Sequence, residues 1–514
     1  MISFRELHTM FRLGILLGIL TICLFGETPS HSQDAVLALG SRRELFVDGH
    51  LIESQVGAVE LKLHEPRPQE VALTFDQPWE GNTSGYPTVM YDGSLYRMIY
   101  RGHRMAWDSG KLEMANSPVA CYAESKDGIN WYRPVLDIVK WEGKDRSKLE
   151  TPTSNNIIWG GSSYTGTFVP FEDGNPNCKP NERFKAVGGD HKVGLHLFTS
   201  PDAKHWTKYD EPIFNQGTLD SMNTLFWDTT RERYTLYFRA ARDGLRSVDV
   251  SHSKDLKNWS PPKTLRYGDS PPQQMYTNGI EPYYRAPHLM VGFPTRYTAR
   301  PITNKLASLP PVGLRKQIGD AFARIASDLS DGLFMTSRDG TNFNRWDEAF
   351  IRPRAENEKR PGNWMYGDNY QSYGLFPTVN EDGIEQLSFL VNHSYWQEYK
   401  THLRRYTIRP DGFVSLNAKY LGGEVTTKLL MFTGTRLEIN YATSGAGSLR
   451  IELQDNAGNP MPGFSLADCE ELIGNRLDQT VNWNGGGLRT LAGKPLRLRF
   501  VLKDADLYSF KFSE

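Results

Sequence analysis

The chain has 514 residues, with 59 Lys and Arg against 60 Asp and Glu and a formal net charge of −1 at pH 7. This balance excludes a strong overall attraction to nucleic acid or to anionic membranes, so no nucleic-acid partner is expected. Aromatic residues make up 12% of the chain, which favours interlocked β-sheets and also suits stacking on sugar rings.

The N-terminal 35 residues are expected to precede the folded part. Arg5 and Arg12 come before and at the edge of an apolar run over 13–25, and small polar residues follow up to Ser32. This pattern is typical of a secretory signal peptide over residues 1–32 and predicts a secreted or periplasmic protein. The apolar run is short for a membrane span, so none is expected after cleavage, and an uncleaved N-terminal anchor is the alternative.

A Ser-x-Asp-x-x-x-aromatic motif occurs four times, at intervals of about 50–85 residues. It begins at Ser125, Ser200, Ser253 and Ser337. In such a motif the Asp carboxylate folds back onto nearby backbone N–H groups, and the aromatic ring wedges the turn against a neighbour. The repeat therefore predicts the same rigid hairpin in each unit of a repetitive fold.

The segments before these motifs alternate apolar and polar residues around turn signals such as Asp92-Gly93, as antiparallel strands do. Each unit is predicted to be a four-stranded antiparallel meander, the blade of a propeller. The units cover 80–140, 160–215, 218–265, 275–352 and 368–418, with a closing strand from 40–75. The sequence thus predicts an all-β fold with a five-bladed β-propeller over 40–418, and a sixth blade is the alternative.

Two further segments stand apart from this repeat. Residues 298–328 form an insertion with helical character towards its end, predicted to be either a lid over the channel or an inert surface excursion. Residues 421–514 contain short alternating segments separated by turn signals, and they predict an accessory β-sandwich.

The predicted catalytic groups are carboxylates at the start of each unit, because the inner strands of a propeller converge on a central channel. Asp220 opens the third unit and Glu281 opens the fourth. Two such carboxylates can protonate a leaving oxygen and act as base or nucleophile in glycosidic bond cleavage. Glu80 and Asp368 are the candidates for a third place, of which Glu80 is preferred. The alternative is that each carboxylate caps a turn or pairs with an arginine.

A second set of residues is predicted to bind the sugar. Its arginines suit carboxylate or sulfate groups, although salt bridges between blades would explain them equally well. His103 is an additional candidate for a substrate or cation contact. No cofactor and no protein metal site is predicted, and a cation such as calcium in the channel is left open. The set consists of Asn223, Tyr86, Arg101, Arg239, Arg285, His288, Arg296, Asp368 and Tyr370.

The hairpin motifs, the opening carboxylates, the signal and the C-terminal strands together resemble the five-bladed glycoside hydrolases of families 32, 43 and 68. The segments 43–48 (Arg-Glu-Leu-Phe-Val-Asp) and 504–510 (Asp-Ala-Asp-Leu-Tyr-Ser-Phe) also look like secreted planctomycete proteins labelled as family 32-like. This resemblance covers nearly the whole mature chain. It implies a glycosidase that acts by acid/base catalysis.

Family 43 carries Asp-Pro, a second Asp and Glu-Gly-Pro at its strand openings, as base, pKa modulator and general acid. The resemblance therefore implies that Glu281, followed by Pro282, is the acid and that Asp220 is the modulator. The chain departs from the family where Tyr86-Pro87 stands in place of Asp-Pro, and the family 32 signatures are missing. The base is thus unassigned, with Glu80 chosen by proximity.

The predicted function is the hydrolysis of glycosidic bonds in a complex polysaccharide, anionic ones included, with polysaccharides or oligosaccharides as partners. The alternatives are a catalytically silent sugar-binding propeller and a protein–protein scaffold of the cell envelope. The sequence leaves the sugar, the stereochemistry and the oligomeric state open.

Overall fold

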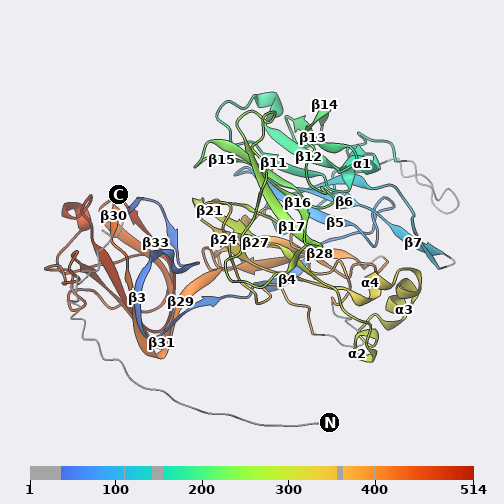
Figure 1. The fold of residues 1–514 in the computed structure, drawn as a ribbon. Coiled ribbons are helices and arrows are strands. Elements are labelled where there is room, and N and C mark those ends of the chain that lie inside the picture. Colours follow the sequence, from blue (N-terminus) through green and yellow to red (C-terminus); the bar gives the residue numbers. More distant parts are fainter. Residues whose placement is uncertain (1–35, 109, 142–153, 356–362, 399) are drawn as a thin grey trace, which may run out of the picture.

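The computed structural model describes residues 36–108, 110–141, 154–355, 363–398 and 400–514 (Figure 1). The described chain is built mainly from β-strands, in agreement with the predicted all-β class. The predicted signal peptide at residues 1–32 lies outside the described residues. Within the described part, no helix has both the length and the apolar character needed to cross a bilayer.

Five four-stranded antiparallel sheets form the larger region of the described chain. The first sheet holds β5 (Gly85–Tyr91), β6 (Tyr96–Gly102), β9 (Val119–Ser125) and β10 (Ile157–Gly160); the second holds β11 (Val169–Glu172), β12 (Phe184–Asp190), β13 (Gly194–Ser200) and β14 (Thr207–Phe214). The third holds β15 (Thr224–Asp228), β16 (Arg233–Arg242), β17 (Leu245–Ser253) and β18 (Lys263–Thr264). The fourth holds β20 (Glu281–Tyr283), β21 (Ala286–Gly292), β24 (Met335–Ser337) and β25 (Asn344–Arg345); the fifth holds β26 (Phe376–Val379), β27 (Glu385–His393), β28 (His402–Ile408) and β4 (Arg67–Thr74).

The fifth sheet joins the two ends of this region. Its last strand, β4, comes from the N-terminal part of the chain and pairs antiparallel with β28, with Leu73 opposite Leu403. All other strands of the five sheets pair with neighbours in chain order. This pairing agrees with the prediction that residues 40–75 supply a closing strand.

The repeated motif forms the same side-chain-capped turn in four sheets. Asp127 Oδ1 accepts hydrogen bonds from the backbone N–H groups of Ile129 and Asn130, both at 2.8 Å. The aspartates of the other three motifs accept the equivalent pair of N–H groups; they are Asp202, Asp255 and Asp339. These aspartates are turn-formers, as the sequence indicates.

The fourth sheet is extended by a smaller sheet and by the helical insertion. The smaller sheet contains β19 (Gln274–Met275), β22 (Thr295–Thr298) and β23 (Leu329–Gly332). The insertion contains α2 (Asn304–Ala307), α3 (Val312–Ala321) and α4 (Ala323–Ser327). Ile318 and Ile325 pack in one apolar cluster with Tyr366, Tyr395 and Trp396. The insertion therefore contacts the aromatic residues that line the pocket described below.

The C-terminal region is a six-stranded sheet with its own apolar core. Its strands are β2 (Glu44–Leu45), β3 (Ile52–Leu63), β29 (Val414–Thr427), β33 (Arg497–Ser513), β31 (Arg436–Gln454) and β32 (Asn475–Thr480). The long strands β31 and β33 change register between Thr443 and Ser448, and such a bulge lets a sheet bend. Residues 52–63 and 414–418 lie within the span predicted for the propeller, but they pair with this sheet.

The remaining elements are short. They are β1 (Leu37–Gly40), which pairs with β30 (Leu430–Phe432), the hairpin of β7 (Met105–Asp108) and β8 (Lys111–Met114), the helix α1 (Ser162–Thr165), and the 3-10 turns η1 (Gly49–Leu51), η2 (Pro180–Glu182) and η3 (Leu488–Thr490).

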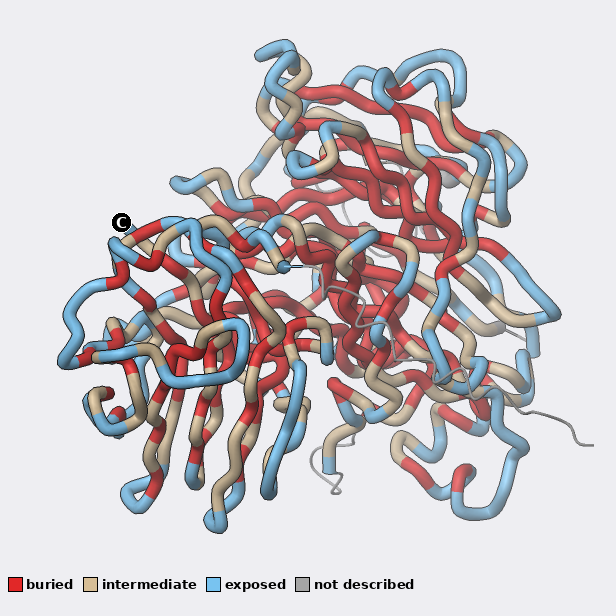
Figure 2. Tube along the Cα trace, turned by 60° about the vertical axis from the view of Figure 1, so that its left-hand side comes forward, coloured by how far each residue is buried: buried red, intermediate tan, exposed pale blue. Residues whose placement is uncertain are grey.

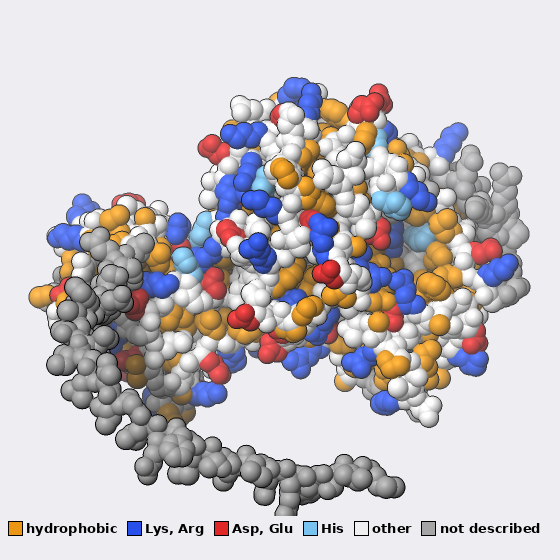
Figure 3. Space-filling view, viewed as in Figure 1, with side chains coloured by type: hydrophobic (Ala, Val, Ile, Leu, Met, Phe, Trp, Pro, Cys, Tyr) orange, Lys and Arg blue, Asp and Glu red, His pale blue; other side chains and the backbone are white. Residues whose placement is uncertain are grey.

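The two regions meet through a continuous apolar contact. Phe334 of the fourth sheet stacks on Phe413, which precedes β29, with ring centroids 4.8 Å apart. Figure 2 shows buried segments running along the strands of both regions, while the connecting loops are exposed. The C-terminal sheet and the helices α2–α4 lie at opposite ends of the molecule (Figure 1). On the face in Figure 3, basic and acidic side chains are interspersed, in keeping with the small net charge.

Candidate functional site

A pocket of about 180 Å³ lies among residues of the first, fourth and fifth sheets and their loops. We call it the tyrosine–arginine pocket. The part of its lining that the structure describes contains no Asp or Glu. The lining residues are Thr83, Tyr86, Arg101, His103, Met105, Tyr276, Tyr366, Tyr370, Tyr395 and Trp396.

The backbone of the first sheet is strained where it borders this pocket. Tyr86 has φ +53°, in the left-handed region that residues with a side chain rarely adopt. The preceding Gly85 allows the chain to pass close to the fifth sheet, because a Cβ there would lie 2.6 Å from Asn392 Nδ2. Strain of this kind clusters at functional sites, so its place beside a pocket indicates a function for Tyr86.

Arg101, from β6, supplies the positive charge of the pocket. Its Nη2 donates hydrogen bonds of 2.7 Å to the Thr83 carbonyl and of 2.7 Å to the Tyr395 hydroxyl. Its Cζ lies 4.6 Å from the centroid of the Tyr86 ring. The Nε–H of Arg101 is buried and has no hydrogen-bond partner among the described residues. The guanidinium of Arg101 thus has one buried donor that no described residue satisfies.

His103 also retains an unused polar atom. Its Nδ1 lies 2.9 Å from Thr83 Oγ1, while its Nε2 is buried without a partner in the described part of the chain. Burial and the charge of Arg101 lower the pKa of His103 to about 3. The imidazole is therefore neutral at physiological pH, and it offers a hydrogen bond rather than a charge.

Tyr276, between β19 and β20, sits against a second guanidinium. Arg239 Cζ is 4.6 Å from the Tyr276 ring centroid, and Arg239 Nη2 donates to the Tyr276 carbonyl. The Tyr366 hydroxyl donates a 2.5 Å hydrogen bond to the Tyr276 hydroxyl. Burial raises the pKa of Tyr276, but Arg239 and the hydrogen bonds of Tyr366 and Tyr86 outweigh it, so the net pKa is lowered.

The pKa values of the other pocket tyrosines are shifted in the opposite direction. Burial is the largest cause in each case, and it raises the pKa of these phenols above the ordinary value; they are Tyr86, Tyr366, Tyr370 and Tyr395. Tyr370 packs on Tyr276 with ring centroids 5.2 Å apart. Among the described tyrosines of this pocket, Tyr276 is therefore the one whose pKa is lowered.

Asp220 lies next to the pocket but does not line it. Its side chain is 58% exposed, and Oδ1 is 3.4 Å from Arg239 Nη1. Asn223, from the same opening, is buried: it donates to the Leu219 carbonyl at 3.1 Å and accepts from the Arg239 N–H at 3.1 Å. Asn223 thus holds the backbone that carries Arg239.

Glu281 lies between the fourth and fifth sheets. One carboxylate oxygen accepts the N–H of Leu375 at 2.9 Å. Burial raises the pKa of Glu281 to about 8, opposed by hydrogen bonds from the Leu375 and Gly374 backbone. The carboxyl is therefore mainly protonated at neutral pH, the state that a general acid requires. Among the described residues no ion pair involves it, and it is not part of the pocket lining.

Asp368 organises the loops of the fifth sheet. Its buried carboxylate accepts the N–H of Met365 at 2.9 Å and the N–H of Tyr395 at 2.8 Å. Burial raises the pKa of Asp368 to about 7. Because Tyr395 lines the pocket, Asp368 fixes the position of one wall.

Glu80 is engaged in a buried ion pair. It accepts hydrogen bonds from Arg133 Nε at 2.9 Å and Nη2 at 2.8 Å, and from the Tyr100 hydroxyl at 2.5 Å. Burial is the largest influence and raises the pKa of Glu80. This arrangement matches the alternative stated for the opening carboxylates, in which each pairs with an arginine.

Three predicted sugar-binding side chains are held by carboxylates away from the pocket lining. Arg285 contacts Asp411 at 2.9 Å, His288 contacts Glu44 at 3.2 Å and Arg296 contacts Asp331 at 2.6 Å. The first two contacts join the fourth sheet to the C-terminal region, and the third lies between the paired strands β22 and β23. Of the predicted site residues, the structure brings Tyr86, Arg101 and Tyr370 into one pocket and places Arg239 and Asp220 beside it.

Sequence analysis missed four aromatic residues that complete the pocket. They are Tyr276, Tyr366, Tyr395 and Trp396. Tyr276 stands two positions before the opening predicted at Asn278, and Tyr366 stands two positions before Asp368. A search for aromatic residues just before each strand opening could have found these two, whereas Tyr395 and Trp396 follow the end of a second strand and carry no such signal.

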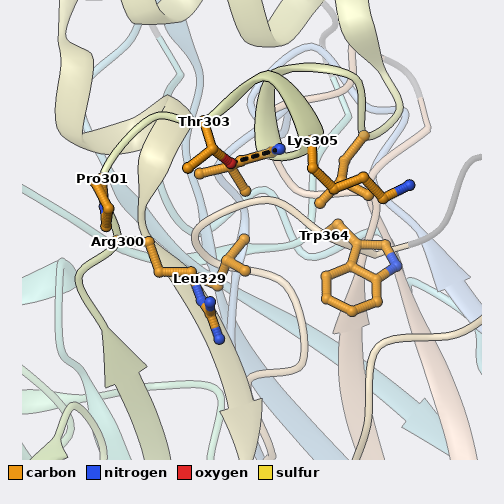
Figure 4. Close-up of a pocket in the computed structure, with 8 residues that line it drawn as sticks. Arg300, Pro301, Thr303, Lys305, Leu329 and Trp364 are labelled. Atoms are coloured by element: carbon orange, nitrogen blue, oxygen red, sulfur yellow. Dashed lines mark hydrogen bonds between the residues drawn. The ribbon is translucent and has the colours of Figure 1, made fainter.

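A second pocket, of about 380 Å³, lies in the helical insertion (Figure 4). Leu306, Leu309 and Leu329 form much of its wall, with Trp364 beside them. Thr303 Oγ1 accepts the N–H of Leu306 at 3.2 Å and caps α2. Among the described residues, no acidic residue, histidine or cysteine lines this pocket, and its charged lining residues are Arg300 and Lys305. Within the described ranges, no three His, Cys, Asp or Glu side chains gather as metal ligands.

No known family model matches the chain, and no curated protein matches it. Several solved structures are similar in fold. One is a glycoside hydrolase with 15% identity and a TM-score of 0.39, covering 68% of this chain and 93% of that one. Another solved structure is described under GH130 glycoside hydrolases that target β-1,2 mannosidic linkages in Candida mannan. It has 16% identity and a TM-score of 0.39, and the match covers 68% of this chain and 95% of that one.

A third is the GH32 β-fructofuranosidase of Bombyx mori, with 9% identity, a TM-score of 0.37 and coverage of 87% of this chain and 94% of that one. The similar structures thus include glycoside hydrolases at a distant level of likeness. Such a likeness carries no argument about activity, and none of these matches supports the predicted link to planctomycete proteins.

Proposed function

We propose that the protein is a secreted enzyme that cleaves glycosidic bonds in an anionic polysaccharide or oligosaccharide, and that the anionic sugar binds in the tyrosine–arginine pocket. In this proposal the five four-stranded sheets are the blades of a five-bladed propeller, and the C-terminal sheet folds as an accessory sandwich. Secretion is proposed from the signal-like pattern of residues 1–32.

The proposal depends on Arg101, whose charge has no anionic partner among the described residues. Its guanidinium lines the pocket, has a buried Nε–H without a partner among the described residues, and is hydrogen-bonded only to neutral oxygens, those of Thr83 and Tyr395. A partly buried cation without an anion is unfavourable, and a bound carboxylate or sulfate would supply the missing charge. The planar guanidinium suits either group because it can donate two hydrogen bonds at once.

The aromatic walls support a sugar as the carrier of that anion. Tyr86, Tyr370 and Trp396 present ring surface around the guanidinium. Rings with a polar edge contact the apolar face of a sugar and leave its hydroxyls free to bond. A neutral sugar would use the rings but would not use the charge of Arg101.

For hydrolysis, Glu281, Asp220 and Glu80 remain the predicted catalytic residues. The raised pKa of Glu281, about 8 as a result of burial, supports its choice as general acid. Asp220 has an exposed carboxylate beside Arg239. The absence of any Asp or Glu from the pocket lining favours a second candidate function, a sugar-binding propeller without catalysis.

The test uses the full chain and panels of uronate-containing, sulfated and neutral oligosaccharides of matched length. Calorimetry measures binding, and a reducing-end assay measures bond cleavage. Preferential binding of the anionic panels, lost in Arg101→Gln, together with release of reducing ends supports the proposal. Binding without cleavage supports the silent sugar-binding propeller, and equal affinity for neutral and anionic chains contradicts an anion site.

A further inference from the structure

Among the described residues, the lining of the tyrosine–arginine pocket offers few groups that can move a proton. Besides arginine they are five tyrosines, Thr83 and His103, and the pKa of His103 is about 3 because burial and Arg101 oppose its protonation. No carboxylate is among these lining residues. A reaction at this pocket that needs a base must therefore draw on a tyrosine.

Tyr276 is the tyrosine whose surroundings stabilise a phenolate. Its hydroxyl oxygen accepts the short hydrogen bond from Tyr366, and the Arg239 guanidinium lies over its ring. Arg246 adds a second positive charge, with Cζ 5.5 Å from the Tyr276 ring centroid. Cations and hydrogen-bond donors at these positions favour the charged form of an acid, which accounts for the lowered pKa.

The backbone around Tyr276 is fixed. The Ser221 hydroxyl donates to the Tyr276 carbonyl at 2.6 Å, and the Tyr276 N–H donates to the Thr295 carbonyl at 2.7 Å. Arg239 donates to the same carbonyl. Three partners from different strands and loops thus hold the residue, so the phenol is positioned before any substrate arrives.

We propose that Tyr276 is the base of the pocket and that the substrate is a uronate-containing chain, which is cleaved by β-elimination while Arg101 binds the uronate carboxylate. This inference rests on the proposed function and gives it a substrate class and a reaction. The proton on C5 of a uronate is next to the carboxylate carbon, and it becomes removable when a cation neutralises that carboxylate. No carboxylate lies among the described lining residues, so a tyrosine is the group left in the pocket to take this proton.

The step balances without water or any co-reactant. The Tyr276 phenolate takes the C5 proton, and the electron pair of the C5–H bond forms the C4–C5 double bond. The C4–O4 bond breaks, and its electron pair leaves with O4 as the reducing end of the neighbouring sugar. The phenol then returns the proton to O4, which regenerates the phenolate. The products are an unsaturated uronate at a new non-reducing end and a normal reducing end.

The experiment incubates the full chain with oligomers of galacturonate and of glucuronate, and with a sulfated neutral glycan as a comparison. Ultraviolet absorbance detects the double bond conjugated to the carboxylate, and mass spectrometry weighs both fragments. Elimination leaves the unsaturated fragment lighter by one water than a hydrolysis product. The expected result is an absorbance rise with uronate chains and none with the sulfated glycan.

Two variants test the role of Tyr276. Tyr276→Phe keeps the ring and its contacts with Arg239, and it should lower the elimination rate by about 100-fold or more, as removal of a general base does. It should still bind the uronate oligomer, which shows that the pocket is intact. Tyr284→Phe, at an exposed tyrosine of the fourth sheet, is the matched control and should be unchanged.

The outcomes separate this inference from the proposed function. Reducing ends without an unsaturated product would leave glycosidic bond cleavage standing and overturn elimination. An unchanged elimination rate in Tyr276→Phe would overturn the role of Tyr276. Neither binding nor products with any anionic chain would overturn the proposed function itself.

Discussion

The hydroxyl of Tyr366 donates a hydrogen bond of 2.5 Å to the hydroxyl of Tyr276. The donor comes from the loop before the fifth sheet, and the acceptor comes from the start of the fourth sheet. The contact therefore joins two sheets at the wall of the pocket, and it stabilises negative charge on Tyr276.

Replacing Tyr366 with Phe should raise the pKa of Tyr276. A hydrogen bond to a charged group contributes about 1.5–3 kcal/mol, so its loss should raise the pKa by about 1–2 units. Ultraviolet difference titration of tyrosinate measures the shift, and the pH profile of product formation should move upwards with it. Tyr209→Phe, at an exposed tyrosine, serves as the control. An unmoved titration would show that Tyr366 does not act on Tyr276.

Replacing Arg101 with Lys should weaken anionic ligands selectively. Lysine keeps the charge but lacks the planar fork that donates two hydrogen bonds. The Kd for a uronate oligomer should rise by about 10-fold or more, while binding of a matched neutral oligomer should change little. Calorimetry measures both ligands, and Arg183→Lys, at a partly exposed ion pair in the second sheet, is the control. Equal losses for both ligands would assign Arg101 a purely structural role.

The pH dependence of stability should carry a contribution from Glu281. Its pKa is about 8 in the folded protein against an ordinary 4.5, because burial disfavours the carboxylate. Between these values the folded protein holds a proton that the unfolded chain has lost. The contribution is therefore complete below about pH 4.5 and is lost as the pH rises through about 8, with a slope of at most about 1.4 kcal/mol per pH unit.

Urea unfolding at several pH values checks this expectation. Glu281→Gln carries no titrating group, so its stability should fall less steeply than that of the wild type over the same range. Asp368, whose pKa burial raises to about 7, contributes a similar slope to both proteins and cancels in the comparison. Parallel curves for the two proteins would argue against a protonated Glu281.

The repeated turn should contribute to stability and not to catalysis. Asp339 Oδ1 accepts the N–H groups of Thr341 and Asn342 at 2.8 and 2.7 Å. Asp339→Ala removes both bonds and should lower the free energy of unfolding by about 1–2 kcal/mol, whereas Asp339→Asn retains an acceptor oxygen and should lose less. Denaturant unfolding measures the change. An unaltered midpoint in the Ala variant would show that the backbone alone holds the turn.

The stability of the contact between the two regions should depend on Glu44. Its buried carboxylate contacts Arg338 at 2.8 Å and His288 at 3.2 Å. Burial raises the pKa of Glu44, but these partners outweigh it and lower the pKa to about 2. Glu44→Ala removes the buried anion beside Arg338, which then keeps only Asp48, and should destabilise the protein by about 3–5 kcal/mol.

Thermal and urea unfolding measure that loss, and ligand binding by the folded fraction should stay unchanged. A variant at an exposed acid, Glu381→Ala, provides the baseline for a surface change. A stable Glu44→Ala protein with weakened sugar binding would instead return His288 to the sugar-binding set, where sequence analysis placed it.

The strands and the hairpins could be predicted from the sequence because their causes are local. Asp127 bonds to residues two and three positions further along, so its motif contains all the groups that form the turn. Alternation of apolar and polar residues likewise predicts a strand with one face packed on its neighbour. The meander order was predicted from the same pattern, but the fourth strand of the first sheet, β10, lies beyond the predicted unit 80–140. The closing strand came from the segment where it was expected.

The pocket required the tertiary structure. The Tyr395 hydroxyl bonds to the Thr83 carbonyl across 312 positions of the chain, and no local pattern signals that contact. The sequence indicated that Asp220 and Glu281 stand at strand openings, but their surroundings differ: one carboxylate meets Arg239 and the other meets the backbone of Leu375.

The sequence by itself determined the all-β class, the repeated turns and the chemical types available at the strand openings, because these depend on neighbours within a few residues. Only the tertiary structure decided that five tyrosines, a tryptophan and Arg101 share one cavity whose described lining includes no carboxylate. The reason is physical: the packing of one sheet on the next sets which side chains meet, and that packing is the sum of many weak contacts between distant parts of the chain.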